Sequence, residues 1–359
     1  MKYHLITFGC QMNKSDSERI AAVFEFFGHK PTLKLGEADL VVINMCSVRQ
    51  PAVDRVHGLA LKIKELRNKK RNKNKKLKTI LTGCIVKKDR SIFSKTFDYI
   101  LDIKDLPNWP FWKKSKKKSA YPKIIPKYAS KIRAFVPVSN GCINFCSYCV
   151  VPFTRGPLVC RSHKEISKEI KCLAKKGFKE IWLLGQNIND YRSPDNPSVN
   201  FAKLFEMIEN IQGNFKVFFL SPNPKNFSVE LIDVLSKSKK FGKRLNLPVQ
   251  SGDNRILKKM NRPYTADEYK KLVKKIREKI PDIDLSTDVI VGFPSETKKQ
   301  FENTAKLFEE VCFNAAFIAK YSPRPGTAAF KTKDDVPFKE KKKREKILMD
   351  IVKKSCLKN

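Results

Sequence analysis

Three cysteines stand within eight residues of this chain, and their spacing points to an iron–sulfur cluster. They are Cys142, Cys146 and Cys149, in the segment Gly-Cys-Ile-Asn-Phe-Cys-Ser-Tyr-Cys-Val. Three thiolates at this spacing can bind three irons of a cubane, whereas ferredoxin clusters and structural zinc sites normally take four protein ligands. The fourth iron then has no protein ligand and can bind another molecule. An iron with such an open coordination position is typical of a catalytic cluster.

Structural zinc and disulfide bonds are the alternative uses of these cysteines. Zinc would need a fourth ligand nearby, and Cys160 and His163 are the nearest candidates. The chain has ten cysteines, begins without an apolar signal segment, and has no apolar run long enough to span a bilayer. We therefore expect a cytoplasmic protein without membrane contact, in a reducing compartment where metal binding or catalysis is the better explanation.

The charge of the chain favours a polyanionic partner. Its 359 residues suggest two domains, and 74 Lys and Arg against 36 Asp and Glu give a formal net charge of +38. Nucleic acid is the obvious partner for such a field, although a Lys-rich composition can also reflect the base composition of a genome. The charge carries no information on sequence specificity.

The first 106 residues are predicted to form a parallel α/β domain. Strands are expected over 3–9, 39–44 and 77–82, with a helix over 51–68 and another that Ser15 or Asp16 caps and that runs to Phe27. Strands and helices that alternate in this way indicate a parallel sheet.

Each of these three strands leads into a cysteine, respectively Cys10, Cys46 and Cys84. Ligand sites of open α/β sheets lie at the carboxyl ends of the strands, so three thiols distant in sequence are expected to meet there. Any one of them alone could be a small packed hydrophobic residue. The repeated placement favours a second cluster held by three cysteines, again with one open iron.

A second domain is predicted over 134–330, after a linker over 107–133 that is rich in proline and lysine. Its expected strands are 134–139, 180–184, 215–220, 244–249, 284–291 and 315–321, with helices over 163–176, 200–210, 228–238, 265–279 and 298–310. Six such units make a partial (β/α)6 barrel, with functional groups on loops at the strand C-termini. The basic tail, 331–359, is expected to be a helix packed on the barrel.

Motifs in both domains resemble the radical S-adenosylmethionine (SAM) methylthiotransferase family over roughly residues 3–330. The first domain carries Thr-Phe-Gly-Cys-Gln-Met-Asn, Ile-Asn-Met-Cys-Ser-Val-Arg and Thr-Gly-Cys. The second carries the Cys-x3-Cys-x2-Cys motif, Leu-Leu-Gly-Gln-Asn, Leu-Pro-Val-Gln-Ser-Gly, Ser-Thr-Asp-Val-Ile-Val-Gly-Phe-Pro and Tyr-Ser-Pro-Arg-Pro-Gly-Thr. The Gly-Cys-Gln-Met-Asn segment is most similar to the MiaB-type branch.

This resemblance implies a tRNA-modifying enzyme with two [4Fe-4S] clusters and SAM. Cys142, Cys146 and Cys149 would hold the cluster that cleaves SAM to a 5′-deoxyadenosyl radical. An auxiliary cluster on Cys10, Cys46 and Cys84 would carry the sulfur. The methylthio group would be added to C2 of N6-isopentenyladenosine at position 37, next to the anticodon. Alternatives are the branches that act on threonylcarbamoyladenosine in tRNA or on a ribosomal protein, and a non-catalytic RNA-binding iron–sulfur protein.

Further cofactor-binding residues follow from position in the motifs. They are Tyr148, Gly185, Gln186, Asn187, Gln250, Ser251, Ser286 and Asp288. Ordinary polar residues at strand ends are the alternative for the last four. Arg155 and Arg161 could contact phosphate or the SAM carboxylate, or lie on a solvated face. Besides tRNA and SAM, the resemblance implies a low-potential electron donor such as flavodoxin or ferredoxin.

The chain departs from the family pattern at several places. Leu158 and Cys160 replace a Glu and a Ser, Met45 replaces a Thr before Cys46, and Ser139-Asn140 precedes Gly141 in place of the usual pair. The sequence also stops near the point where the family's C-terminal RNA-binding TRAM domain would begin. Either the sequence is truncated at this point, or its Lys-rich surface and basic tail compensate for the missing module in RNA binding.

Overall fold

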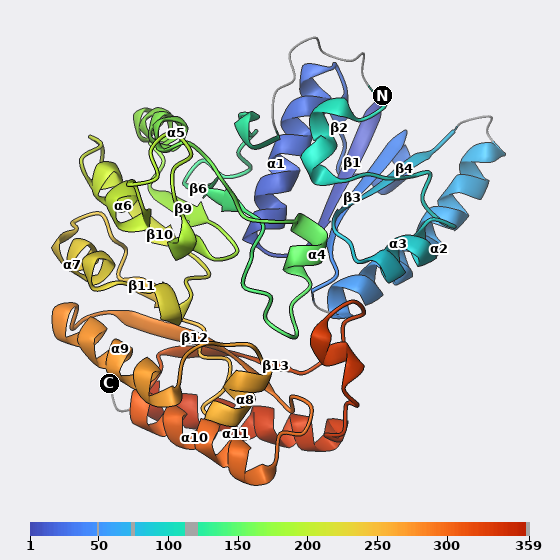
Figure 1. Cartoon of the computed structure of the whole chain (residues 1–359). Coiled ribbons are helices and arrows are strands. Elements are labelled where there is room, and N and C mark those ends of the chain that lie inside the picture. The colour runs from blue at the N-terminus through green and yellow to red at the C-terminus, as the bar shows by residue number, and fades with distance from the viewer. Residues whose placement is uncertain (49, 73–75, 112–120, 357–359) are drawn as a thin grey trace. The chain divides into compact units, whose positions relative to one another are not determined.

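The computed structural model divides the chain into two compact units (Figure 1). It describes all residues except 49, 73–75, 112–120 and 357–359. The first unit comprises 1–131 together with 153–155, and the second comprises 132–152 and 156–359.

The first unit contains a five-stranded parallel sheet of order β2-β1-β3-β4-β5. Its strands are β1 (Lys2–Phe8), β2 (Lys30–Pro31), β3 (Leu40–Cys46), β4 (Lys78–Cys84) and β5 (Tyr99–Ile100). Every residue of β3 is buried, as expected for a central parallel strand covered on both faces. The predicted parallel α/β fold is confirmed, and the two edge strands add to it.

Helices cover both faces of this sheet (Figure 1). On one face, Val41 and Ile43 of β3 pack with residues of α2 (Gln50–Arg71) and with Phe93 of α3 (Lys87–Phe93). On the other, Leu40 and Val42 pack with α1 (Gln11–Phe26). This alternation follows from the period of two in strand side chains.

The start of α1 differs from the prediction. The helix begins at Gln11, directly after Cys10, so Ser15 and Asp16 lie inside it and are fully buried. Neither residue caps the helix. Local sequence suggested a cap because both side chains can accept backbone hydrogen bonds. In the structure, Ser15 Oγ instead accepts from Arg19 of the same helix at 2.6 Å, and Asp16 pairs with the distant Arg155.

Two aromatic residues of the segment predicted as a linker belong to the core around α1. Trp109 and Tyr121 are buried in that cluster, beside the 3-10 turns Ile103–Asn108 and Tyr121–Lys123. The lysine run 113–118 lies outside the described residues.

The second unit contains six parallel strands in two sheets, β6-β9-β10 and β11-β12-β13. The strands are β6 (Arg133–Pro137), β9 (Glu180–Leu184), β10 (Lys216–Phe219), β11 (Arg244–Asn246), β12 (Asp284–Val291) and β13 (Ala315–Lys320). This arrangement agrees with the predicted partial barrel. A short antiparallel pair, β7 (Ser139–Asn140) with β8 (Val159–Cys160), flanks the segment that carries the three clustered cysteines.

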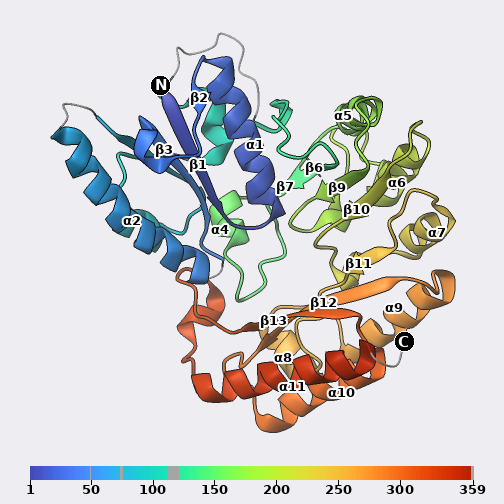
Figure 2. The same cartoon turned by 180° about the vertical axis from the view of Figure 1, so that it is seen from behind.

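Helices alternate with the barrel strands. They are α4 (Val151–Arg155), α5 (His163–Lys175), α6 (Phe201–Glu209), α7 (Val229–Lys237), α8 (Asn254–Lys259), α9 (Ala266–Lys279) and α10 (Lys298–Val311). The tail forms α11 (Phe338–Cys356), which packs on α10 and β13 (Figure 2). Short 3-10 turns occur at Leu35–Glu37, Ile188–Asp190, Pro224–Asn226 and Ala328–Lys331.

Strand β12 presents two different faces. Leu285, Val289 and Val291 are buried, whereas Ser286 and Asp288 on the opposite face keep part of their surface exposed. The second face is mixed, because Ile290 on it packs against an apolar cluster that includes Met260. Among the helices of the described ranges, none has the length and apolar character that crossing a bilayer requires.

Candidate metal centres

Cys10, Cys46 and Cys84 gather at the carboxyl edge of the first unit's sheet. Cys46 and Cys84 end β3 and β4 and are register partners, so their strands run about 4.8 Å apart at this point. Cys10 lies just beyond the end of β1 and precedes the first residue of α1. The topology thus brings together three thiols whose positions in the sequence are far apart.

The two strand-end cysteines interact directly. A hydrogen bond with the Cys46 thiol lowers the pKa of Cys84 to about 6, and the guanidinium of Arg155 acts in the same direction. The same hydrogen bond and burial raise the pKa of Cys46 well above its ordinary value. One sulfur of the pair therefore favours the thiolate form, which is the form that binds metal.

Arg155 approaches this cysteine pair from a later part of the sequence. Its Nε donates to Cys84 Sγ at 3.0 Å and its Nη2 donates to Asp16 Oδ2 at 2.7 Å. The Tyr121 hydroxyl donates to the other oxygen of Asp16. The sequence alternatives for Arg155 were a phosphate or SAM contact or a solvated face, and the structure shows a buried cation on a cysteine instead.

Buried amides join the start of α1 to the end of β3. Asn13 Nδ2 donates to Asn44 Oδ1 at 2.8 Å, and Asn44 Nδ2 donates to the Asn13 carbonyl at 2.8 Å. The Cys10 amide donates to Asn13 Oδ1 at 3.3 Å. These contacts set Cys10 beside Cys46. Our sequence reasoning gave neither asparagine a role, although each lies within three residues of a predicted ligand.

The triad of the second unit lies on the loop between β7 and α4. At its start, Gly141 N–H donates to Gln186 Oε1 at 2.6 Å. Further along, Asn261 Nδ2 donates to the carbonyls of Asn144 at 3.1 Å and Phe145 at 3.0 Å. Side chains from two other segments of the unit therefore hold the loop in place.

Hydrogen-bond donors point at the sulfurs of this loop. The Asn144 amide is 3.5 Å from Cys142 Sγ, and Arg262 Nη1 is 3.5 Å from Cys146 Sγ. Burial raises the pKa of Cys149 to about 12, so a bound metal is needed to keep this sulfur as a thiolate at neutral pH. The donor set fits an iron–sulfur cluster.

The zinc alternative finds less support. His163 Nδ1 lies 2.8 Å from Ser193 Oγ and is occupied there. A cubane spreads its cysteines over separate irons, whereas zinc needs its ligands around a single point.

Glycine and polar groups follow β9. A Cβ on Gly185 would lie 2.7 Å from Ser139 Oγ. Ser139 Oγ and Asn187 Oδ1 are buried without a hydrogen-bond partner among the described residues, so each suits a polar ligand. Tyr148 packs half-buried on a cluster that contains Met260.

The other predicted cofactor residues fall into two groups. Ser286 donates to Asn246 Oδ1 at 3.1 Å, and Asn246 Nδ2 donates to Asp288 Oδ2 at 2.7 Å. Sequence reasoning missed Asn246, which ends β11 and is the register partner of Ser286. This polar row lies on the partly open face of β12.

Gln250 and Ser251 sit differently. Gln250 has a φ of +66°, and its backbone N–H donates to the backbone carbonyl of Asp288 at 2.9 Å. Ser251 is fully buried, and its hydroxyl accepts from the Asp253 amide at 3.2 Å. Arg161 is also buried and pairs with Glu169 at 2.7 Å, in place of the predicted phosphate or SAM contact or solvated position.

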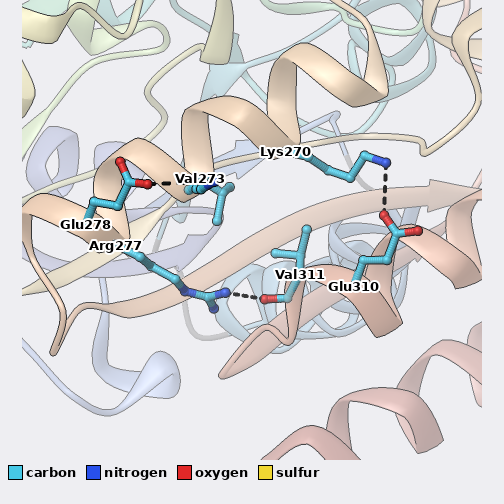
Figure 3. Close-up of a pocket in the computed structure, with 7 residues that line it drawn as sticks. Lys270, Val273, Arg277, Glu278, Glu310 and Val311 are labelled. Carbon is cyan, nitrogen blue, oxygen red and sulfur yellow. Dashed lines mark hydrogen bonds and ion pairs between the residues drawn. The ribbon is translucent and has the colours of Figure 1, made fainter.

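A pocket of about 440 Å³ lies elsewhere on the second unit, between α9 and α10 (Figure 3). Lys270 Nζ donates to Glu310 Oε2 at 2.9 Å across it, and Arg277 Nη1 donates to the Val311 carbonyl at 2.5 Å. Its lysines and glutamates form ion pairs, Lys270 with Glu310 and Lys274 with Glu278, and no cysteine is among its lining residues. We do not assign the chemistry to this pocket.

Comparison with known proteins identifies relatives over nearly the whole chain. The model of the "Radical SAM superfamily" matches residues 136–308, and that of "Uncharacterized protein family UPF0004" matches 2–102. The chain is 40% identical to a tRNA-2-methylthio-N(6)-dimethylallyladenosine synthase of Dehalococcoides mccartyi strain CBDB1, over 98% of this chain and 82% of that protein. It is 38% identical to the synthase of Thermotoga petrophila, over 99% and 82%.

Solved structures share the fold at low sequence identity. The cobalamin-dependent SAM radical enzyme OxsB superposes with a TM-score of 0.60 at 11% identity, over 98% of this chain and 56% of that one. The radical SAM methyltransferase TsrM of Kitasatospora setae gives 0.58 at 13% identity, over 92% and 77%.

Proposed function

This chain belongs to the family of tRNA-2-methylthio-N(6)-dimethylallyladenosine synthases, and from this we propose that it adds a methylthio group to C2 of N6-isopentenyladenosine in tRNA. The isopentenyl group is the dimethylallyl group of the relatives' name. The protein is a radical SAM methylthiotransferase. We place the modified nucleoside at position 37, beside the anticodon.

One observation supports this proposal most directly. Cys46 and Cys84 are register partners at the end of two neighbouring strands, with Cys10 at the same edge. A second set of three cysteines lies on one loop of the other unit. Transfer of sulfur by a radical enzyme requires a sulfur donor besides the radical source, and the auxiliary set suits that donor.

The chemistry calls for cofactors because a C–H bond of an aromatic base resists acid–base side chains. Two [4Fe-4S] clusters and SAM supply, when bound, a radical that activates the C–H bond and a sulfur for transfer. Cys142, Cys146 and Cys149 would hold one cluster, and the other three cysteines the second.

The protein's own groups hold and orient these components. Gln186 fixes the start of the cysteine loop through Gly141. The row of Asn246, Ser286 and Asp288 offers amide, hydroxyl and carboxylate groups on the partly open barrel face, which suits the amino and hydroxyl groups of SAM. The unpartnered oxygen of Asn187 suits the same ligand.

The partners follow from charge and from the reaction. A formal charge of +38 favours binding to the tRNA backbone, which should weaken steeply as salt rises. We also infer a low-potential electron donor, such as flavodoxin or ferredoxin, and a cytoplasmic location where tRNA and reductant are available.

Nucleoside analysis tests the proposal. The chain is expressed in a host that lacks its own methylthiotransferase, and tRNA nucleosides are resolved by mass spectrometry. We expect 2-methylthio-N6-isopentenyladenosine to appear and its unmethylthiolated precursor to decline. Methylthio-threonylcarbamoyladenosine would reassign the substrate, and a modified ribosomal protein would move the enzyme to another branch.

Anaerobic reconstitution tests the enzyme class separately. We expect about eight irons per chain, four for each cluster, and release of 5′-deoxyadenosine from SAM under reductant. A single cluster without SAM cleavage would instead identify a non-catalytic RNA-binding iron–sulfur protein.

A further inference from the structure

The segment 153–155 belongs to the first unit, although it follows Cys149 in the sequence and is preceded and followed by residues of the second unit. Arg155 ends this segment and lies six positions after Cys149. Its guanidinium donates to Cys84 Sγ at 3.0 Å. The stretch of chain that carries the radical SAM cysteines therefore also supplies a cation to the auxiliary set.

Buried partners hold the Arg155 guanidinium at this site. The Arg155 side chain is 3% exposed and Asp16 is fully buried. Burying a guanidinium costs free energy unless it is paired with an opposite charge and its N–H groups are hydrogen-bonded. Asp16 Oδ2 accepts from Arg155 at 2.7 Å, and Tyr121 donates to the other carboxylate oxygen. Asp16 and Tyr121 thus hold the guanidinium in one orientation, which leaves its Nε directed at Cys84.

We propose that Arg155 is a positioning residue that tunes the auxiliary cluster by donating to the sulfur of Cys84. The inference rests on the proposed function, because it requires a cluster on Cys10, Cys46 and Cys84. Reduction adds negative charge to a cluster. A nearby cation and an N–H donor to a ligand sulfur both stabilise the reduced form, so they raise the reduction potential. The same hydrogen bond strengthens retention of the cluster.

Arg262 is the matched residue of the other triad. It is 9% exposed and its Nη1 lies 3.5 Å from Cys146 Sγ. Each set of three cysteines therefore has one buried arginine on one sulfur. The two arginines provide a control for each other, since each should affect the potential of its own cluster alone.

Redox titration of the reconstituted full chain, followed by electron paramagnetic resonance, tests the inference. We expect Arg155→Met to shift the potential of one cluster to more negative values and leave the other unchanged. Arg262→Met should do the reverse. A variant with Cys142, Cys146 and Cys149 replaced by Ala identifies the auxiliary signal. We also expect a chelator to remove auxiliary iron roughly tenfold faster from Arg155→Met, as loss of one charged hydrogen bond implies.

Two further variants keep the test decisive if Arg155→Met folds poorly in thermal melts. Arg155→Lys retains the charge but not the fork and should give an intermediate shift. Tyr121→Phe removes the hydroxyl that holds the Asp16 carboxylate without changing the net charge, and should give a smaller shift of the potential in the same direction as Arg155→Met. An unchanged auxiliary potential and iron-loss rate in folded variants would overturn the inference. Absence of auxiliary iron from the unsubstituted chain would contradict the proposed function instead.

Discussion

Cys46 and Cys84 face each other as register partners at the last paired position of β3 and β4. Parallel pairing places both side chains on the same face, and the hydrogen bond between them lowers the pKa of Cys84 to about 6. The edge of an ordinary sheet thereby becomes a site with paired thiols.

Replacing Cys46 by Ala should remove the auxiliary cluster only. We expect iron in the reconstituted protein to fall from about eight to about four per chain. SAM cleavage to 5′-deoxyadenosine should continue, because the other triad is intact, while the methylthio nucleoside disappears. Iron analysis measures the cluster content, and nucleoside mass spectrometry measures the methylthio product. The exposed Cys172 is the control, since Cys172→Ala should change neither. Retention of eight irons in Cys46→Ala would refute the ligand assignment.

Gly83→Ala should disrupt the end of β4. Gly83 has a φ of +107°, and a Cβ there would lie 2.2 Å from the Met45 carbonyl oxygen. The left-handed conformation and the clash with a neighbouring strand both oppose any side chain. We expect a lower unfolding temperature and a loss of auxiliary iron, since Cys84 comes next. Gly58→Ala in α2 meets open space and should stabilise by up to about 1 kcal/mol. Equal melting temperatures for the two variants would disagree with this account.

Gln186→Ala should slow SAM cleavage. Without the Gln186 side chain, the backbone N–H of Gly141 loses its acceptor, which lies 2.6 Å away. One such hydrogen bond contributes about 1 kcal/mol, which corresponds to roughly a fivefold lower rate of 5′-deoxyadenosine formation. Gln186→Glu keeps the acceptor oxygen and should retain most of the rate. Gln300→Ala removes a cap of α10 and serves as the remote control. A rate unaffected by Gln186→Ala would show that the anchor is dispensable.

Arg344→Met should destabilise the second unit. Arg344 of α11 pairs with Glu296 at 2.7 Å, with side-chain exposures of 5% and 1%. Glu296 in turn accepts from the Gly292 amide at 2.6 Å, so the pair connects the tail helix to the loop after β12. Breaking a buried ion pair costs about 3–5 kcal/mol. Glu302→Gln, which breaks a pair exposed by 84% and 58%, should cost at most about 1 kcal/mol. Urea unfolding compares the two.

The same pair has a predictable pH dependence. Burial raises the pKa of Glu296, and Arg344 opposes that rise. Without Arg344 the pKa rises further, so the ionised carboxylate becomes more unfavourable in the folded state. The loss of stability in Arg344→Met should therefore grow as pH rises and shrink as acid protonates Glu296. A loss that grows toward acid would contradict this assignment.

Local sequence predicted most of the fold. Apolar runs that end in polar or glycine residues predicted β1, β3, β4 and the six barrel strands, because burial on a strand or helix face imposes a short period on the sequence. The edge strands β2 and β5 have two residues each and leave no such period. They exist because a neighbouring strand pairs with them.

The predicted start of α1 was wrong because contacts distant in the sequence decided it. Ser and Asp are common N-cap residues, which is why Ser15 or Asp16 was predicted to cap the helix. Asp16 instead pairs with Arg155, which is 139 residues away in the sequence. Its burial cannot be read from its neighbours. Asn13 and Asn44 form a similar contact across 31 residues.

The sequence alone determined which residues can do chemistry, because cysteine spacing and the residues after each strand are local properties of the chain. Tertiary structure decided what surrounds them. Strand register pairs Cys46 with Cys84, and packing directs Arg155 and Arg262 at particular sulfurs. Hydrogen bonds and buried charges act over a few ångströms in space regardless of distance along the chain. Only the folded arrangement could therefore assign these two arginines to their cysteines.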